Sequence, residues 1–157
     1  MLLSEARQEW AGPGGAAAGE ARVEFAIRPY DVDVAGIVSN IVYVRWLEDL
    51  RMEMLAGIFP AGELGRRSLM PVVVRTEIDY RSSLRFQDTC VGLMRLEAVG
   101  QTSVRLRARF ADGRGATAAE ALQVGVFLDT RTHRPVAVPE EVRALARGAA
   151  ARGADER

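Results

Sequence analysis

A single stretch of the chain has a helical hydrophobic period, and the change to a strand period after it restricts the folds the chain can adopt. Over 40–57, apolar residues recur at spacings of three and four, as on the buried face of an amphipathic helix. Downstream the chain instead alternates apolar and polar residues, which is the period of a half-buried strand. Four such strands are predicted, at 72–86, 89–99, 102–110 and 117–128. Gly100 and the segment 111–113 separate neighbouring runs and favour tight hairpins, so we expect these strands to be antiparallel.

One more strand precedes the helix. Over 22–30, the apolar residues Val23, Phe25 and Ile27 alternate with polar ones. The order strand, helix, four antiparallel strands predicts an α+β fold, in which a curved antiparallel sheet wraps one long central helix. A short closing helix is expected over 138–147. The free edge of such a sheet invites pairing with a second copy of the chain.

The predicted helix has defined ends and a defined buried face. Ser39 is a suitable N-cap, because its hydroxyl can accept a hydrogen bond from a backbone N–H of the first turn. Gly57 and Pro60 are expected to end the helix. The apolar face is predicted to consist of Val44, Leu47, Leu50, Met54 and Ile58.

The length of 157 residues corresponds to one domain of ordinary size. We expect a single domain over 21–147. The segment 1–20 is rich in Gly, Ala and Pro, and it is predicted to be a flexible N-terminal lead. The segment 148–157 has a similar composition and is predicted to be a flexible C-terminal tail.

Composition excludes several classes of function. All 21 basic residues are Arg and balance 21 acidic residues, which argues against a general nucleic-acid binder and rules out a Schiff-base or P-loop lysine. With one cysteine and one histidine, a disulfide within the chain and a Cys-based zinc site are excluded, and we predict neither a metal nor a cofactor. The sequence has no apolar run of membrane-spanning length and no secretory signal, so a cytoplasmic location is predicted.

The loop before the helix carries two carboxylates, Asp31 and Asp33. The first turn of a helix offers backbone N–H groups without partners and a partial positive charge. A carboxylate a few residues before such a turn therefore lies near a site that can stabilise an oxyanion. These two features are the minimum needed to hydrolyse an acyl compound. The same Asp-x-Asp pattern also occurs as turn and cap chemistry alone.

The segment 31–49 resembles a known motif. Its sequence, DVDVAGIVSNIVYVRWLED, is similar to that of hotdog-fold thioesterases of the 4-hydroxybenzoyl-CoA thioesterase type, a group that includes the acyl-CoA thioesterases associated with the Tol–Pal system. The part SNIVYVRW also resembles plant-type acyl-ACP thioesterases. Further along, 72–88 resembles the family's central strand, and 122–139 its last strand and the following turn. The resemblance covers about 22–147 and implies a hotdog fold with thioesterase activity.

The resemblance also assigns roles to single residues. Asp33 matches the catalytic carboxylate of the family, which acts as a nucleophile or as a general base for water. Gly36 matches the glycine that keeps the loop tight beside the substrate. Asn40 lies where relatives carry His or Tyr and where a backbone N–H polarises the thioester carbonyl, so we predict that the N–H groups of Asn40 and Ile41 stabilise the oxyanion. Tyr43, an aromatic position of the motif, is a candidate substrate contact with core packing as the alternative.

Two positions depart from the relatives. Plant-type acyl-ACP thioesterases carry Asn and His where this chain has Ala35 and Ile37, so the catalytic pair of that subgroup is absent. Enzymes associated with the Tol–Pal system carry His at the position of Asn40. The chemistry is therefore expected to depend on Asp33 and on backbone donors, and an ionised carboxylate suits nucleophilic attack or base catalysis.

Several other polar residues are candidates for binding. Thr76 shares a phase with Val74 and Ile78, and it is either a pocket hydroxyl or an ordinary strand residue. In hotdog enzymes the acyl channel runs along the subunit interface, with basic residues at its mouth. Arg81 and Arg85 are therefore candidates for the phosphates of CoA or phosphopantetheine, with exposed arginines that bind no ligand as the alternative.

Four more residues have side chains that could take part in catalysis or binding. Glu48 and Asp49 are helix carboxylates of a kind that some hotdog enzymes use, but flanking arginines favour a solvated ion-pair face. Cys90 is predicted to be a small buried apolar side chain, and His133 to lie in a surface turn.

The sequence thus predicts a homo-oligomeric hotdog thioesterase that hydrolyses acyl-CoA-type thioesters to free acid and thiol. Self-association as a dimer or a tetramer is expected to complete the pocket with the neighbouring subunit's strand around 76–81. One alternative is a thioesterase that releases chains from an acyl carrier protein in a fatty-acid or polyketide pathway. Another is a non-catalytic module that binds acyl thioesters. A dehydratase or hydratase is disfavoured, because His133 lies far in sequence from the helix.

Overall fold

The computed structural model describes residue 17 and residues 19–155 of the chain. The elements follow in the order β1 (Glu20–Ala26), η1 (Pro29–Asp31), α1 (Asn40–Ile58), α2 (Glu63–Arg66), β2 (Leu69–Tyr80), β3 (Thr89–Val99), β4 (Ser103–Asp112), β5 (Thr117–Asp129), β6 (Pro135–Val136) and α3 (Glu140–Asp155). The predicted order of strand, helix and four strands is confirmed, with η1, α2 and β6 as short additions.

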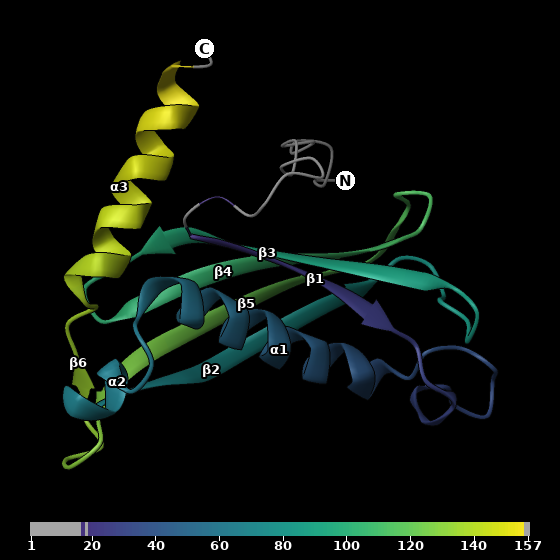
Figure 1. Cartoon of the computed structure of the whole chain (residues 1–157), viewed down its shortest axis with the longest axis horizontal. Helices are drawn as coiled ribbons and strands as arrows, with labels where there is room; N and C mark the ends of the chain where they lie inside the picture. Colours follow the sequence, from purple (N-terminus) through teal and green to yellow (C-terminus); the bar gives the residue numbers. More distant parts are fainter. Residues whose placement is uncertain (1–16, 18, 156–157) are drawn as a thin grey trace.

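The strands form one antiparallel sheet in the order β1-β3-β4-β5-β2, with β6 paired to β5. The curved sheet has α1 against one of its faces (Figure 1). This arrangement confirms the expected α+β fold with one long helix held by an antiparallel sheet. Within the described residues, β1 and β2 are the two edges of the sheet.

The core lies between α1 and the sheet. Leu47 of α1 and Phe110 of β4 are fully buried there. Phe25 of β1 stacks on Trp46 of α1 with ring centroids 4.8 Å apart. This stack depends on Gly92 of β3, because a Cβ at that position would lie 2.6 Å from the Phe25 ring. A glycine in the strand therefore provides the space in which the ring packs.

The buried face of α1 differs in part from the prediction. Leu47, Leu50 and Met54 are buried as expected, whereas Val44 is 46% exposed. The remaining buried positions of the helix are Val42, Tyr43 and Trp46. The predicted cap is also wrong in its mechanism, because the Ser39 side chain makes no cap hydrogen bond. The Ser39 backbone carbonyl instead accepts a hydrogen bond from the Val42 N–H at 2.9 Å.

Strand β2 is shorter than predicted and contains a bulge. It ends at Tyr80, because the next two N–H groups both donate to the Ala118 carbonyl and so leave the regular ladder. Pairing with β5 shifts between Val73 and Arg75. The bulge breaks the alternation on which the phase of Val74 and Thr76 was predicted, and Val74 is 59% exposed.

Helix α3 is longer than the predicted closing helix over 138–147. It projects from one end of the sheet (Figure 1) and continues to Asp155, within the segment 148–157 that the sequence assigns to a tail. Most of the predicted lead 1–20 lies outside the described residues. The boundaries of the domain therefore stay a prediction. Among the described helices, none is long and apolar enough to cross a membrane.

Candidate active site

Asp31 and Asp33 have different surroundings, although they are two residues apart. Asp31 is 6% exposed, and its Oδ2 accepts a hydrogen bond from the Arg28 backbone N–H at 2.8 Å. Its carbonyl accepts a second bond from the Ser39 N–H at 2.9 Å. These bonds join the start of the loop to the residue before α1. The first carboxylate of the motif thus stabilises the loop, as its turn-and-cap interpretation predicts.

Asp33 is exposed at the tip of this loop. Its Oδ1 accepts a hydrogen bond from the Ala35 N–H at 2.8 Å, and its backbone N–H donates to the Ile37 carbonyl at 2.9 Å. Gly36 has a φ of +75°, a conformation that favours glycine and closes the turn. Among the described residues, no donor contacts the other carboxylate oxygen, Oδ2. Asp33 is therefore oriented through one oxygen and open to a ligand through the other.

The loop returns to the start of α1. Val32 and Val38 form an isolated antiparallel bridge, and the Val38 N–H donates to the Leu84 carbonyl at 2.8 Å. The N–H groups of Asn40 and Ile41 belong to the first helical turn, where no intrahelical acceptor exists. Neither donates to a backbone acceptor in the part of the chain that the structure describes. The expected carboxylate thus lies on a short, cross-linked loop that leads directly into the helical turn with the expected oxyanion donors.

Tyr80 joins this site from the end of β2, which sequence analysis did not anticipate. Its hydroxyl donates to the Asn40 carbonyl at 3.3 Å, and its side chain is 45% exposed. Partial burial raises the pKa of the Tyr80 phenol, which therefore stays a hydrogen-bond donor at neutral pH. The only feature of the sequence that could have indicated this position is that Tyr80 alternates in phase with Ile78 along the strand.

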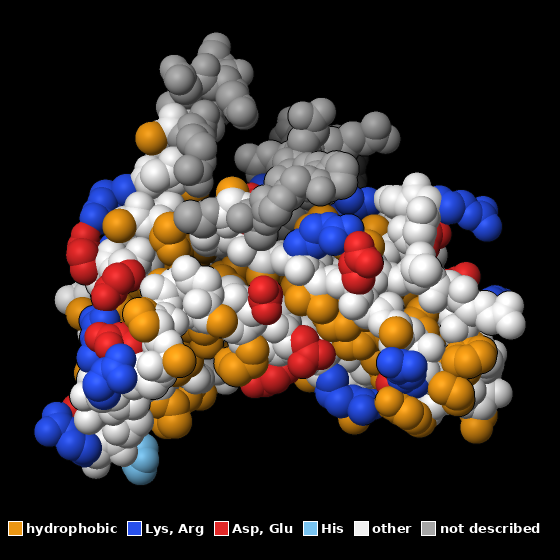
Figure 2. Space-filling view, in the orientation of Figure 1, with side chains coloured by type: hydrophobic (Ala, Val, Ile, Leu, Met, Phe, Trp, Pro, Cys, Tyr) orange, Lys and Arg blue, Asp and Glu red, His pale blue; other side chains and the backbone are white. Residues whose placement is uncertain are grey.

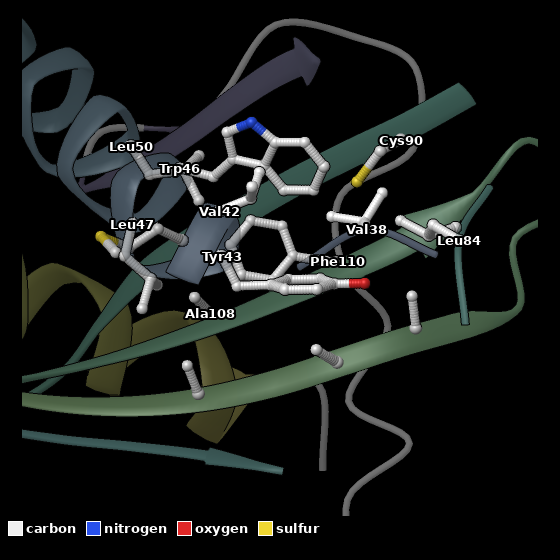
Figure 3. Close-up of a cluster of buried hydrophobic side chains, with 14 of the residues drawn as sticks. Val38, Val42, Tyr43, Trp46, Leu47, Leu50, Leu84, Cys90, Ala108 and Phe110 are labelled. Atoms are coloured by element: carbon white, nitrogen blue, oxygen red, sulfur yellow. The ribbon is translucent and has the colours of Figure 1, made fainter. Parts of the chain in front are cut away.

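Tyr43 lies in the core beneath the site. It is 2% exposed, and its ring is 5.3 Å from Trp46 and 5.4 Å from both Tyr80 and Phe110, between ring centroids. Figure 3 shows Tyr43 packed beside the core side chains Trp46 and Phe110. Burial raises the pKa of the Tyr43 phenol, and the nearby Cys90 and Tyr80 raise it further. Tyr43 therefore packs in the core, as the alternative interpretation of this residue expects. Its contact with a substrate stays a prediction.

Thr76 lies away from the loop, in a chain of polar side chains. Its hydroxyl accepts a hydrogen bond from Gln123 Nε2 at 3.0 Å, and Gln123 Oε1 accepts one from Arg51 Nη1 at 2.8 Å. Arg51 also pairs with Glu48. Sequence analysis missed Gln123, which is 2% exposed and stands alone among the apolar inward positions of β5.

The two arginines predicted to bind phosphate are both exposed. Arg81 forms ion pairs with Glu120 at 3.3 Å and Asp79 at 3.8 Å. The Arg85 backbone N–H donates to Asp88 Oδ2 at 2.7 Å. Binding of phosphate by either side chain stays a prediction.

The remaining candidates have the surroundings that sequence predicted. Cys90 is buried, and burial together with the Asp112 carboxylate raises the pKa of its thiol to about 12. His133 is exposed in the turn after β5, at a φ of +54°. The described residues contain no group of three or more His, Cys, Asp or Glu side chains arranged to hold a metal ion.

The long helix against a curved antiparallel sheet, with an aspartate loop at the helix start, defines a hotdog fold of the thioesterase type. The chain belongs to the thioesterase-like superfamily, whose sequence model matches residues 27–145. The predicted family and fold are therefore confirmed. Comparison with curated protein sequences gives no match.

Solved structures with the same fold include a thioesterase from Thermus thermophilus in complex with coenzyme A and Zn. It is 30% identical with a TM-score of 0.71, over 82% of this chain and 92% of that one. The 12:0-ACP thioesterase from Umbellularia californica is 25% identical with a TM-score of 0.72, over 83% of this chain and 50% of that one. The DHNA-CoA thioesterase from Staphylococcus aureus has a TM-score of 0.77 over 88% and 95% of the two chains, and at 13% identity it supports the fold alone.

Proposed function

We propose that this protein hydrolyses an acyl thioester, most readily an acyl-CoA, to the free acid and the thiol. The observation that carries the proposal is the Asp33 carboxylate, which is fixed through Oδ1 and open at Oδ2. It belongs to the loop that ends at the free N–H groups of Asn40 and Ile41. This pairing supplies both requirements of thioester hydrolysis, a base or nucleophile and an oxyanion site.

In the reaction, the thioester carbonyl oxygen accepts hydrogen bonds from the first-turn N–H groups of α1. Asp33 Oδ2 removes a proton from a water molecule, and the water oxygen forms a bond to the carbonyl carbon. Negative charge develops on the carbonyl oxygen, which the amides and the helix dipole stabilise. The C–S bond then breaks, and the thiolate leaves and takes up a proton.

In the alternative route, Asp33 Oδ2 itself attacks the carbonyl carbon, the C–S bond breaks and the thiolate leaves, so that a mixed anhydride of the acyl group and Asp33 forms. Water then cleaves this intermediate and regenerates the carboxylate. A single turnover in H₂¹⁸O identifies the anhydride route when ¹⁸O enters Asp33, because water has then attacked the carboxylate carbon of the anhydride. Label in the acid product alone results from direct attack by water and equally from cleavage of the anhydride at its acyl carbon.

Coenzyme A is proposed as the thiol carrier because the Thermus thermophilus relative is complexed with coenzyme A at 30% identity. An acyl carrier protein is the second candidate, supported by the similarity to the Umbellularia californica 12:0-ACP thioesterase. Rates on acyl-CoA and on acyl carrier protein of equal chain length separate the two. A chain that retains acyl-CoA without turnover is instead a binding module. The cytoplasmic location stays a prediction.

Self-association is proposed to complete the pocket. Strand β2 is a sheet edge, and no described strand pairs with its outer side. Large apolar side chains are exposed on the same elements: Ile41, Val44 and Met52 of α1, and Val74 of β2. Figure 2 shows hydrophobic side chains exposed among charged ones on the face that carries α1. Pairing of two β2 edges about a two-fold axis would cover them and bring the strand around 76–81 to the partner.

The test is thiol release from a panel of acyl-CoAs by the wild type and by Asp33→Asn, which keeps the shape of the side chain and removes its charge. We expect the variant to lose two or more decades of kcat, about 100-fold, in line with loss of an essential base or nucleophile. Glu53→Gln, an equal change on the exposed side of α1, serves as the control. Equal rates for wild type and Asp33→Asn would reduce Asp33 to a turn residue.

A further inference from the structure

A partly open cavity of about 310 Å³ lies between α1 and the sheet, and no residue of the Asp33 loop lines it. Its walls come from the second half of α1, from β2 to β5 of the sheet and from the start of α3. In Figure 1, the second half of α1 and the start of α3 lie at the same end of the sheet. The cavity adjoins the smaller of the two apolar clusters, which contains Phe59, Phe127 and Val142.

The cavity has one polar end and an apolar interior. Glu48 and Arg51 are the only charged side chains among its described lining residues, and of the lining residues of α1 they are the two closest to the helix start. They pair with each other, and Arg51 is held by Gln123 at 2.8 Å. Every other side chain on the wall is apolar. Among the described residues, no buried side-chain N or O atom lacks a partner, so no unpaired polar side chain faces the interior.

We propose that this cavity takes the acyl chain of the substrate, and that the chain is linear, aliphatic and of medium length. The proposal rests on the thioesterase function above and names the substrate class for it. The tail occupies the apolar interior, and the thioester end leaves past Glu48 and Arg51. A ligand of this kind has the same division as the cavity, with one polar end and one apolar end.

The volume sets the chain length. An engineered apolar cavity of about 150 Å³ binds benzene, a six-carbon ring. The cavity here is about twice as large, which corresponds to a chain on the order of ten carbons. A benzoyl group would leave much of this volume empty. An acyl group with a hydroxyl or carboxyl at its far end would bury a polar group without a partner.

In the proposed dimer, the polar end of the cavity would be served by the loop of the second copy rather than by the loop of its own chain. Glu48 follows Asn40 by eight residues, which is about 12 Å along the helix axis. Two copies joined about a two-fold axis at β2 would have antiparallel α1 helices. The first turn of one α1 would then approach the middle of the other. The Asp33 loop of the second copy is the one that serves this cavity.

Gly125 and Leu55 allow the cavity volume to be changed in both directions. A Cβ at Gly125 of β5 would have its nearest contacts at 3.4 Å from Val104 Cγ2 and 3.5 Å from the Val72 carbonyl, which are ordinary packing distances. Gly125→Val therefore fits the strand and fills part of the cavity. Leu55 of α1 lines the cavity, so Leu55→Ala enlarges it. Leu145→Ala, a half-buried leucine of α3 that does not line the cavity, is the matched control.

The experiment measures binding of S-alkyl-CoA thioethers with four to fourteen carbons by calorimetry, together with hydrolysis of the matching acyl-CoAs, benzoyl-CoA and ω-hydroxydecanoyl-CoA. Affinity of the wild type is expected to rise about four-fold per methylene and then to level near ten carbons. The chain length at which affinity stops rising is called the break. Gly125→Val should shift the break to chains about three carbons shorter, and Leu55→Ala to chains about three carbons longer. Leu145→Ala should leave it in place. Circular dichroism and denaturation check that each variant is folded.

The outcomes separate the two proposals. A break that neither Gly125→Val nor Leu55→Ala moves, or an affinity independent of chain length, overturns the cavity as the acyl site even when hydrolysis is normal. Preference for benzoyl-CoA or ω-hydroxydecanoyl-CoA over decanoyl-CoA overturns the aliphatic class. Thioether binding that levels off as expected, without hydrolysis of the matching acyl-CoAs or acyl carrier proteins, supports the pocket and refutes the thioesterase function.

Discussion

The two ends of α1 are built by different means. The loop at its start is held by backbone hydrogen bonds and by Asp31, which fix the position of Asp33 within a few residues of sequence. The second half of the helix instead borders a cavity, whose shape depends on apolar side chains from distant strands. Directional bonds position a reacting atom, whereas side-chain volume selects a ligand by size. Chemistry and selectivity are therefore expected to respond to different substitutions.

The largest expected effect tests this separation directly. Asp33→Asn should lower kcat about 100-fold for every chain length, whereas Gly125→Val should lower it only for chains near ten carbons. When the two variants are mixed and allowed to exchange subunits, decanoyl-CoA hydrolysis should return, because one site of each mixed dimer then combines an intact Asp33 with an intact cavity. Steady-state rates before and after mixing measure this. No recovery in a mixed dimer confirmed by native mass spectrometry would mean that each chain supplies its own Asp33.

Substitutions of the two carboxylates of the motif should have different effects on the free energy of unfolding. Asp31→Ala removes the acceptor of the Arg28 N–H from a buried site, and we expect it to cost about 1–3 kcal/mol of unfolding free energy. Asp33→Ala acts on an exposed side chain and should change this free energy by less than about 0.5 kcal/mol. Urea denaturation of both variants gives the comparison. Equal losses would show that Asp33 also has a structural role.

A smaller effect is expected from the polar chain beside the cavity. Gln123→Met keeps the size of the side chain and removes its bonds to Arg51 and Thr76. The expected loss is about 1 kcal/mol of unfolding free energy, with the chain-length optimum unchanged because Gln123 does not line the cavity. Denaturation and the acyl-CoA panel test the two parts. A shifted optimum would mean that Gln123 sets the cavity shape through Arg51.

The smallest effect is expected at Tyr80. Tyr80→Phe removes one 3.3 Å hydrogen bond at a half-exposed site and keeps the ring against Tyr43. The unfolding free energy should fall by less than about 0.5 kcal/mol, and kcat should change by less than about three-fold. Steady-state kinetics with decanoyl-CoA is the measurement. A ten-fold loss of kcat at constant KM would instead identify the phenol as a group that acts on the thioester.

Local patterns in the sequence were sufficient to predict the long helix, the strands and the position of the Asp-x-Asp loop before the helix. The period of α1, the hairpin signals and the Asp-x-Asp loop each depend on residues close in sequence. The roles of Asp33 and Asn40 came instead from the resemblance of the motif to hotdog thioesterases, and they stay predictions. The bulge at Val74 was not predictable, because it arises from the pairing of β2 with β5. Gln123 and the cavity were missed for a similar reason, since both depend on which side chains meet across the sheet. Ser39 matched a local pattern, but its backbone took over the role expected of its hydroxyl.

The burial of Cys90 has a practical consequence for these assays. A thioesterase releases a free thiol at every turnover, and thiols exchange readily with disulfides and with aromatic disulfide reagents when they are ionised and accessible. The single cysteine of the chain is fully enclosed, with a pKa of about 12, so it is neither. The native protein can therefore be mixed with a chromogenic thiol reagent without contributing a signal of its own. Slow colour formation in the absence of substrate would then report unfolding of the protein.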